Sequence, residues 1–281
     1  MKTHNFTKNH LIWFLLLGVS THVYSQTLHR QGKFYIYWGW NRAGYLDTDI
    51  KFTGEKYNFT LSDVEAKDKP TPKSFQTYFN PKYFTIPQYN YRIGYYLNDK
   101  YQLSIGMDHM KYVMTQNQEV GIDGYILKEE GVYNGVYDRN KIVLSEDFLK
   151  FEHTDGLNYA NVEIRRDDHL WGIKNVALNL TTGIGAGMMI PRSDVTLMTK
   201  PRNDAFHVAG YGTGILVGLQ ALFFNHFFIQ SELKFGYIRM MDIRTSPYKE
   251  DKAKQSIRYG QMAVVFGYLF GGKSIKNQDE K

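Results

Sequence analysis

The chain has 281 residues, of which 43% are hydrophobic and 16% aromatic, and it carries a formal net charge of +6. Its mean hydropathy of −0.44 is too low for a helical membrane protein, and no apolar run after the N-terminus is long enough for a membrane helix. The lack of cysteine excludes structural disulfides, a thiolate nucleophile and a lipidated N-terminal cysteine. A transmembrane β-barrel reconciles the polar average with an aromatic content typical of interfacial girdles.

The N-terminal residues 1–25 have the pattern of a secretory signal peptide. Positive charge at Lys2 precedes the apolar segment Leu11–Val19, and polar residues follow. We therefore expect a cleaved signal, an exported domain over residues 26–270, and a polar C-terminal tail over residues 271–281. Export without a lipid anchor, combined with a barrel, predicts the outer membrane as the location.

Eight segments alternate apolar with polar or small residues. They cover residues 34–45, 89–97, 101–114, 151–165, 175–190, the two arms of a hairpin over 206–240, and 257–270. Soluble sandwiches also alternate, but their strands are usually about five or six residues long. The hairpin arms reach the roughly 9 to 11 tilted residues that cross a bilayer. The sequence predicts an all-β, antiparallel, up-and-down transmembrane barrel of eight strands.

The hairpin over 206–240 shows the pattern most clearly. Its turn, Phe224-Asn225-His226, places Phe223 opposite Phe227, so the apolar residues of both arms share one face. The same period of two assigns an outward face to the other strands. The expected outward set includes Phe34, Ile36, Trp38, Trp40, Tyr91, Ile93, Tyr95, Leu103, Ile105, Ala160, Val162, Ile164, Met262, Val264, Phe266, Tyr268 and Phe270.

Charged residues fall on the inward face of these strands. They are Arg92, Asp108, Glu163, Arg165, Glu232 and Lys234, three cations and three anions. Buried charges are tolerated only when they are paired. We therefore expect one connected polar network that plugs the lumen, and eight strands leave room for little else.

Two long loops lie between these strands. Residues 47–85 contain three prolines, so they cannot be membrane strand throughout, and a short hairpin is expected around Gly54. Residues 115–150 contain an expected strand extension over 120–127. Drawing part of this second loop into the wall would give ten strands, which is the main alternative. Short turns on one side and long loops on the other assign the turns to the periplasm.

Several stretches of the chain resemble a known family. They are WGWNRAGY, FTLSDVEAKDKP, FTIPQYNYRIGYY, GMDHMKYVM, EDFLKFEHTDGLNY and the closing VVFGYLF. They are similar to an uncharacterised family of bacterial outer-membrane β-barrel proteins. The resemblance implies the fold, the location, and recognition of the aromatic last strand by barrel-assembly machinery, and it supplies no known activity.

One stretch resembles a catalytic motif. His153-Thr154-Asp155 is similar to the His-x-Ser stretch of outer-membrane phospholipases and lipid A deacylases, in which base and nucleophile share one strand face. Here Asp155 occupies the serine position and cannot be the expected nucleophile. We predict that His153 is not a catalytic base, and that the Asp155 carboxylate favours its charged form. The alternative is a hydrolase acting on lipid A or phospholipid through the His153 region.

Two glycine triplets lie on neighbouring inward faces. In a pair of antiparallel strands, the numbers of opposing residues sum to a constant. We therefore expect Gly183 to pair with Gly214, Gly185 with Gly212, and Gly187 with Gly210, because this one register matches all three pairs. Six missing side chains leave space that close packing does not allow to stay empty. Either bulky inward residues such as Tyr159 fill it, or it is a lumen groove for a slender ligand.

No cofactor or metal site is expected from the sequence. The glycines over 183–187 lack the strand-to-helix passage of a nucleotide loop, and the histidines form no HExxH pair. Acidic loop residues could hold a hard cation, but their spacing matches no known ligand set; they are Asp63, Glu65, Asp68, Glu146 and Asp147.

The expected partners follow from charge and location. Basic residues are scattered through loops without an aromatic patch, so nucleic acid is not expected, whereas anionic outer-membrane lipids and lipopolysaccharide are. The sequence thus predicts a plugged barrel that acts as a surface binding or envelope-structural protein with an unknown ligand.

Overall fold

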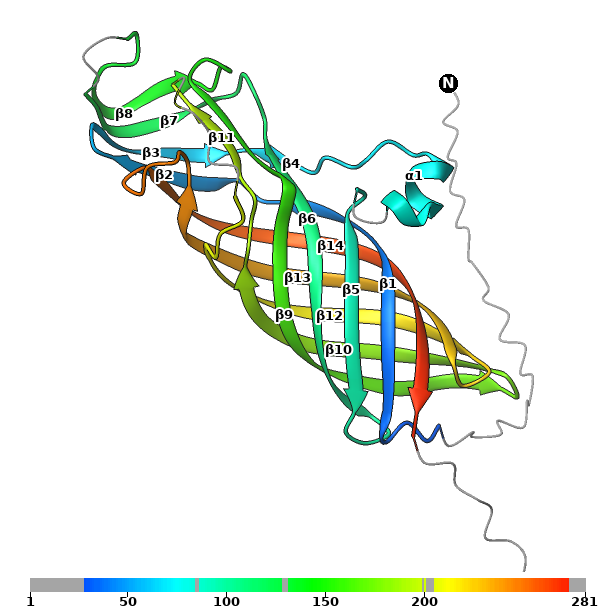
Figure 1. Ribbon diagram of the computed structural model, residues 1–281. Helices are drawn as coiled ribbons and strands as arrows, with labels where there is room; N and C mark the ends of the chain where they lie inside the picture. Colours follow the sequence, from blue (N-terminus) through cyan, green and yellow to red (C-terminus); the bar gives the residue numbers. More distant parts are fainter. Residues whose placement is uncertain (1–27, 84–85, 128–130, 199, 201–204, 273–281) are drawn as a thin grey trace, which may run out of the picture.

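Eight antiparallel strands form a closed ring in the computed structural model, which describes residues 28–272 except 84–85, 128–130, 199 and 201–204 (Figure 1). In ring order they are β1 (Lys33–Tyr45), β5 (Tyr89–Tyr96), β6 (Tyr101–Met114), β9 (Leu149–Ile173), β10 (Val176–Met189), β12 (Gly210–Phe223), β13 (Phe227–Arg244) and β14 (Lys252–Gly271). The predicted fold class is confirmed. The expected signal peptide and most of the tail lie outside the described residues. No helix in the described part of the chain is long and apolar enough to span a membrane.

The first and last strands of the ring close it along the whole length of β1. Pairing runs from Lys33 opposite Gly271 to Tyr45 opposite Tyr259. Closure satisfies the backbone groups of both strands and removes the open edges that a flat sheet would expose.

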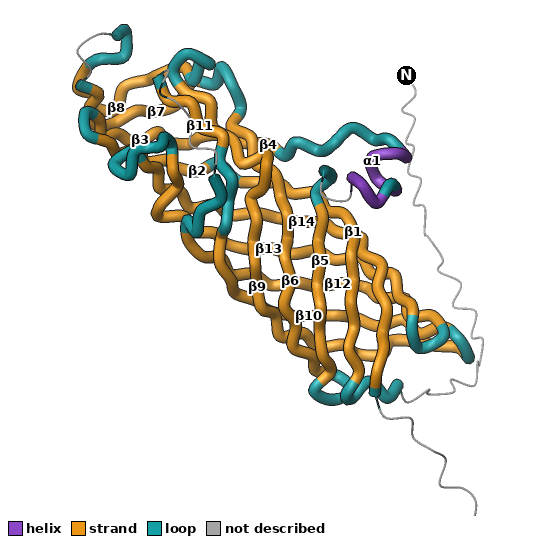
Figure 2. Tube along the Cα trace, viewed as in Figure 1, coloured by secondary structure: helices purple, strands orange, loops and turns teal. Residues whose placement is uncertain are grey.

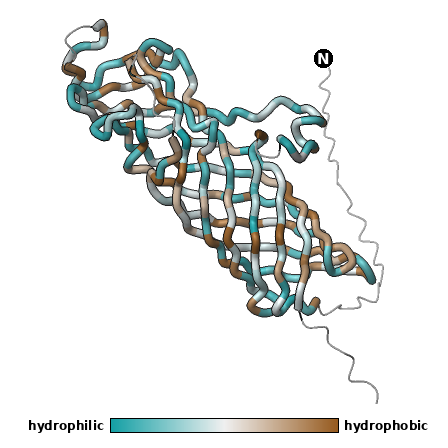
Figure 3. The backbone as a smooth tube through the Cα atoms, in the orientation of Figure 1, coloured by the Kyte–Doolittle hydropathy of each residue, from teal (hydrophilic) through white to brown (hydrophobic). Residues whose placement is uncertain are grey.

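The predicted alternation of faces is confirmed in the ring. The expected outward apolar residues are exposed or half-buried, whereas their inward neighbours are buried. Figure 3 shows hydrophobic and hydrophilic positions mixed along the strands of the wall. At the hairpin, Phe223 pairs with Phe227 as expected, and Phe224 and Asn225 turn the chain with positive φ. We call the end of the barrel with this turn the turn end, and the opposite end the loop end.

Four further strands of the same sheet continue the barrel wall at the loop end (Figure 2). The first residues of β14 pair with β2 (Thr48–Gly54), which is followed by β3 (Tyr57–Val64), β7 (Glu119–Ile126) and β8 (Gly135–Val143). We call these four strands the outer sheet. The hairpin predicted around Gly54 is confirmed. The ten-stranded alternative is wrong, because β7 and β8 join the outer sheet and not the ring.

The remaining elements are short and lie beside the ring strands. They are β4 (Ala66–Lys67), which pairs with β6, β11 (Asp194–Leu197), which pairs with β9, the helix α1 (Phe75–Phe79) and a 3-10 turn (Pro81–Tyr83). The α1 ring of Phe79 lies edge-on to Trp40 of β1, at a centroid distance of 5.3 Å. An aromatic cluster therefore forms on the outward face of β1.

Strand β9 is longer than predicted and reaches Ile173 instead of Arg165. Its register against β6 shifts between Met110 and Tyr112, beside Gly156 with φ of 138°. Such a bulge admits an extra residue and bends the strand. The part of β9 that precedes the bulge still pairs with β6 at Glu152 and His153, and its other edge pairs with β11.

The interior of the barrel is filled in three layers. Apolar side chains form an outer core at the loop end, including Phe52, Phe59, Leu61, Tyr112, Ile122, Phe148, Phe151 and Met240. Another apolar cluster fills the turn end, with Tyr35, Tyr37, Tyr96, Ala177, Leu222, Phe228, Ala263, Val265 and Leu269. The charged residues lie between these two layers.

Candidate functional site

The middle of the lumen holds the six charged residues predicted to face inward. Arg92, Asp108, Glu163, Arg165, Glu232 and Lys234 are each 2% exposed or less. They come from β5, β6, β9 and β13, which the ring closure brings around one space. Their alternation with outward apolar residues places every one of them inside.

Lys234 and Arg92 share the same two carboxylates. Lys234 Nζ lies 2.5 Å from Asp108 Oδ2 and 2.7 Å from Glu163 Oε1. Arg92 Nη2 lies 2.9 Å from Glu163 Oε1 and 3.9 Å from Asp108 Oδ1. Each carboxylate therefore faces both of these cations, which offsets the cost of removing all four groups from water.

Arg165 extends this network across the lumen. Its Nη1 donates to Glu232 Oε1 at 2.7 Å, and its Nε donates to Glu163 Oε2 at 2.7 Å. The Tyr37 hydroxyl accepts hydrogen bonds from Arg92 Nε at 3.0 Å and from Arg165 Nη2 at 2.8 Å. All six charged residues are thus linked, and with three cations and three anions the formal charge of the set is zero. We call this set the lumen network.

A further inward charged residue, the carboxylate Asp167, lies beyond the predicted end of β9. It accepts hydrogen bonds from Tyr96 Oη, Gln102 Nε2 and Thr181 Oγ1, each at 2.6 Å. Continuing the alternation of β9 two residues past Arg165 would have placed Asp167 inside. Beside the lumen network, the hollow lined by Tyr37, Gln102 and Arg165 has no volume accessible to a sphere the size of water.

The predicted pairing of the glycine triplets is wrong by two residues. Gly185 pairs with Gly214 and Gly187 with Gly212, whereas Gly183 lies opposite Leu216. Hairpin turns fix register locally, but a long loop joins these two strands, and packing sets their register. The two strands still present their glycines to the same side.

Side chains occupy the space inside these glycines. A Cβ added at Gly212 would lie 3.0 Å from the Tyr159 ring, and one at Gly185 would lie 2.5 Å from Glu163 Cγ. The Tyr159 hydroxyl also donates to the Gly212 carbonyl at 3.0 Å. These contacts favour filling by bulky residues over an open lumen groove.

His153 lies above the apolar band of the wall, at the edge of the outer core. Its Nδ1 is 2.7 Å from Ser193 Oγ, and the imidazole is fully buried beside Tyr112 and Phe151. Burial lowers the pKa of His153 to about 3, because the charged form loses its hydration. The expectation that Asp155 favours the charged form is wrong, since Asp155 points to Arg192 at 3.6 Å.

The contact between His153 and Ser193 was missed because the two residues lie 40 positions apart in the chain. A general base works best with a pKa near the operating pH, and a pKa of about 3 is far below neutrality. Ser193 is 6% exposed. In this geometry the pair fixes the β9 end of the outer core through a neutral hydrogen bond.

The acidic loop residues do not converge on one point. Asp68 accepts from Gln88 Nε2 at 2.7 Å, and Asp147 accepts from the Tyr133 hydroxyl at 2.5 Å. Among the described residues, no group of three histidine or acidic side chains could hold a metal ion.

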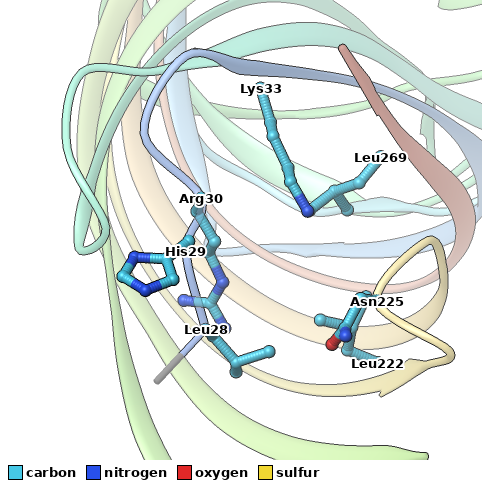
Figure 4. Close-up of a pocket in the computed structure, with 7 residues that line it drawn as sticks. All are labelled: Leu28, His29, Arg30, Lys33, Leu222, Asn225 and Leu269. Carbon is cyan, nitrogen blue, oxygen red and sulfur yellow. The ribbon is translucent and has the colours of Figure 1, made fainter. Parts of the chain in front are cut away.

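A basic hollow of about 250 Å³ lies at the turn end of the barrel (Figure 4). It is lined by Leu28, His29, Arg30, Lys33, Leu222, Asn225 and Leu269. Arg30 is 3% exposed, and its Nη1 lies 3.9 Å from Asp167 Oδ2, whereas its Nε and Nη2 have no hydrogen-bond partner among the described residues. Two cationic side chains around a small hollow could hold an anionic group. Strand periodicity could not predict this hollow, because Leu28 to Arg30 precede the first strand.

Neither a protein-family model nor a curated protein matches the chain. Among solved structures, it is similar to the outer membrane protein OprG from Pseudomonas aeruginosa, with 10% identity over 87% of this chain and 98% of that one and a TM-score of 0.40. It is also similar to the outer membrane protein AlkL, with 8% identity, 88% and 93% coverage and a TM-score of 0.37. The attachment invasion locus protein Ail of Yersinia pestis shows 12% identity, 85% and 99% coverage and a TM-score of 0.30.

Proposed function

We propose that the chain is an outer-membrane barrel with a plugged lumen that acts as a surface binding or envelope-structural protein. Outward apolar residues cover all eight strands of the ring, which a water-soluble barrel would not display so extensively. A lipid bilayer is the environment that covers such a face, and a closed barrel leaves no unpaired backbone in it.

The observation that carries the plugged lumen is the lumen network. Its six charged side chains meet across the ring, and apolar layers lie on both sides of it. A permeating ion would have to displace several charge-assisted hydrogen bonds, which are stronger than neutral ones.

Planar bilayer recording tests the plug. The purified protein is expected to give no stable conductance steps, because the lumen network and both apolar layers close the ring. As a comparison, Arg165→Ala combined with Glu232→Ala removes two large opposed side chains and should produce brief openings. Large, stable steps from the unaltered protein would contradict the proposal.

The outer sheet supports a surface role. It projects from one side of the loop end, and β8 ends the strand order, with no described strand on its free edge (Figure 1). An exposed edge offers unpaired backbone groups to an extended partner segment. Val132 and Val136 expose apolar side chains beside this edge.

Excision of the β7–β8 hairpin separates the two roles. Asn117 N donates to Leu144 O at 2.9 Å, so the ends meet, and residues 118–143 can be replaced by a short turn. The variant is expressed in cells that lack the protein. A surface binding role predicts that it does not restore the normal envelope lipid composition and detergent sensitivity, whereas an envelope-structural role predicts that it does.

A point variant covers the case in which the excised chain does not fold. Val132→Lys combined with Val136→Lys charges the edge of β8 and leaves the outer core intact, since both side chains are exposed. Comparison of the envelope lipid composition and detergent sensitivity of the strains provides the measurement. If cells that express the variants or the unaltered protein have the same envelope properties as cells that lack the protein, neither role applies.

The hydrolase alternative rests on one observation, the 2.7 Å contact of His153 Nδ1 with Ser193 Oγ. We expect the purified protein to release no fatty acid from phospholipid or lipid A, because the pair is buried and its imidazole is a weak base. Release that Ser193→Ala and His153→Gln both abolish, in variants that keep the barrel folded, would establish the alternative.

A further inference from the structure

Two paired glycines leave a notch in the outward surface of the barrel. Gly44 of β1 lies opposite Gly260 of β14, and Gly260 lies opposite Phe235 of β13. The notch has a volume of about 760 Å³. It is lined by Gly44, Tyr45, Leu46, Phe235, Gly236, Tyr237, Arg258, Tyr259 and Gly260.

The barrel itself does not require glycine at Gly44 or Gly260. A Cβ added at Gly44 would meet nothing within 4 Å, and one at Gly260 would make an ordinary 3.5 Å contact with the Phe235 ring. Neither residue has a positive φ. By contrast, a Cβ at Gly39 or Gly210 would collide with the neighbouring backbone. What the pair of glycines produces is therefore an open space on the outward face.

The notch lies where the outward face changes from apolar to basic. Along β14, the outward residues from Phe270 to Met262 are apolar, and beyond Gly260 they include Arg258 and Lys254. Along β13, Phe235 and Tyr237 are followed by Arg239. In the proposed membrane setting, this level is the boundary between acyl chains and headgroups.

A polar groove continues the notch toward the loop end and shares Tyr237 and Arg258 with it. Its charged lining residues are Lys51, Arg239, Lys254 and Arg258, together with Asp47, Asp49 and Asp63. Within the described residues, none of these four cations forms an ion pair, and Asp49 accepts a hydrogen bond from the backbone of Asp63. Exposed cations therefore remain available directly above an apolar hollow.

We propose that the notch binds a phosphorylated, multiply acylated lipid of the outer leaflet, with the chemistry of lipid A. One acyl chain lies against Leu46, Phe235 and Tyr237, and Arg258 and Arg239 contact a phosphate. Arginine matches phosphate geometry because its planar fork donates two parallel hydrogen bonds. This inference rests on the outer-membrane location proposed above.

Native mass spectrometry of the full chain in detergent, with purified bisphosphorylated lipid A added, tests the site. The unaltered protein is expected to retain one lipid. Gly44→Leu adds a side chain to the notch at a position where an added Cβ meets nothing within 4 Å, and Arg258→Ala removes the shared cation, so each should weaken binding at least tenfold. Ser231→Leu, elsewhere on the outward face of β13, and Lys141→Ala, on β8, are matched controls that should bind normally.

Several outcomes would overturn the site. Dephosphorylated lipid A binding as tightly as the bisphosphorylated form would remove the role of Arg258 and Arg239, and an equal preference for phosphatidylglycerol would assign the notch to a phospholipid. Normal binding by both Gly44→Leu and Arg258→Ala would place the lipid elsewhere. If Gly44→Leu does not fold, Arg258→Ala decides alone. Density fractionation of cell membranes tests the outer-membrane location separately.

Discussion

The middle and the loop end of the barrel are built in opposite ways. In the middle, the outward residues are apolar and the interior holds the lumen network. At the loop end, the outward residues of β13 and β14 include Arg239, Lys254 and Lys252, and the interior is the apolar outer core. The same strands pass through both regions, so a single strand changes which face is apolar.

This reversal follows from what lies outside each region. Where lipid covers the wall, the hydrophobic effect does not drive burial of the interior, and ion pairs with hydrogen bonds close the lumen instead. Where water covers the wall, apolar side chains move inside as they do in a soluble domain. The inward polar residues of the middle also keep every strand too polar to be taken for a membrane helix.

The largest expected effect comes from breaking the lumen network. Lys234→Ala leaves Asp108 and Glu163 close together with one cation fewer, and removing one partner of a buried pair costs about 3–5 kcal/mol. We expect the free energy of unfolding to fall by that amount in urea titrations of the purified protein.

Neutralising a buried carboxylate that loses its cation provides the control. Lys234→Met combined with Asp108→Asn removes one charge of each sign, leaves the remaining set neutral, and should recover part of the loss. If Lys234→Ala alone leaves the unfolding transition unchanged, the ion pairs do not hold the middle of the barrel together.

A comparable but local loss is expected in the outer core. Phe59→Ala removes a fully buried ring that stacks on Phe52 at 5.2 Å and contacts Phe148, and such truncations cost about 3–5 kcal/mol. Hydrogen exchange should accelerate in β2, β3 and β7 while β12 and β13 stay protected. Equal acceleration in all strands would mean that the two regions unfold as one unit.

A smaller effect is expected from overfilling the glycine positions. Gly185→Leu and Gly212→Leu place side chains against Glu163 and Tyr159, and overpacking usually costs about 1–3 kcal/mol per site. The midpoint of thermal unfolding should fall in each variant. Gly44→Leu, which adds the same side chain to open space, is the control and should leave the midpoint unchanged.

The last expected effect, absent at neutral pH, is a pH dependence of the outer core. His153 has a pKa of about 3 in the fold against an ordinary value of 6.5, so the unfolded chain binds a proton that the folded chain does not. The stability from this residue is complete above about pH 6.5 and is lost as the pH falls toward 3. Proteolysis of the loop end should increase over this range, and His153→Gln should flatten the profile.

The sequence was sufficient for the ring because its signal is local. Alternation within one strand assigns faces, and the three-residue turn at Asn225 fixes one register, so residues such as Arg165 and Lys234 could be placed inside. Pairing across long loops carries no such signal, which is why the glycine register was wrong by two residues.

The outer region was harder to predict for the same reason. Strand β8 has a pattern of mostly exposed residues, since only one of its edges is paired, and thus lacks the apolar alternation of the ring strands. The contacts of His153 with Ser193 and of Gly44 with Gly260 join residues from distant parts of the chain. They are visible only once the ring is closed.

The pairing of β1 with β14 also determines how the protein must be made. Lys33 meets Gly271, so the last hydrogen-bonded ladder joins residues separated by 271 − 33 = 238 positions. Until β14 is in place, every partly folded form has two unpaired strand edges and an uncovered apolar face, and contacts this distant in sequence form slowly. A chain of this design must therefore be held apart from its own copies between synthesis and membrane insertion, and closing the seam between its first and last strands ends that exposure.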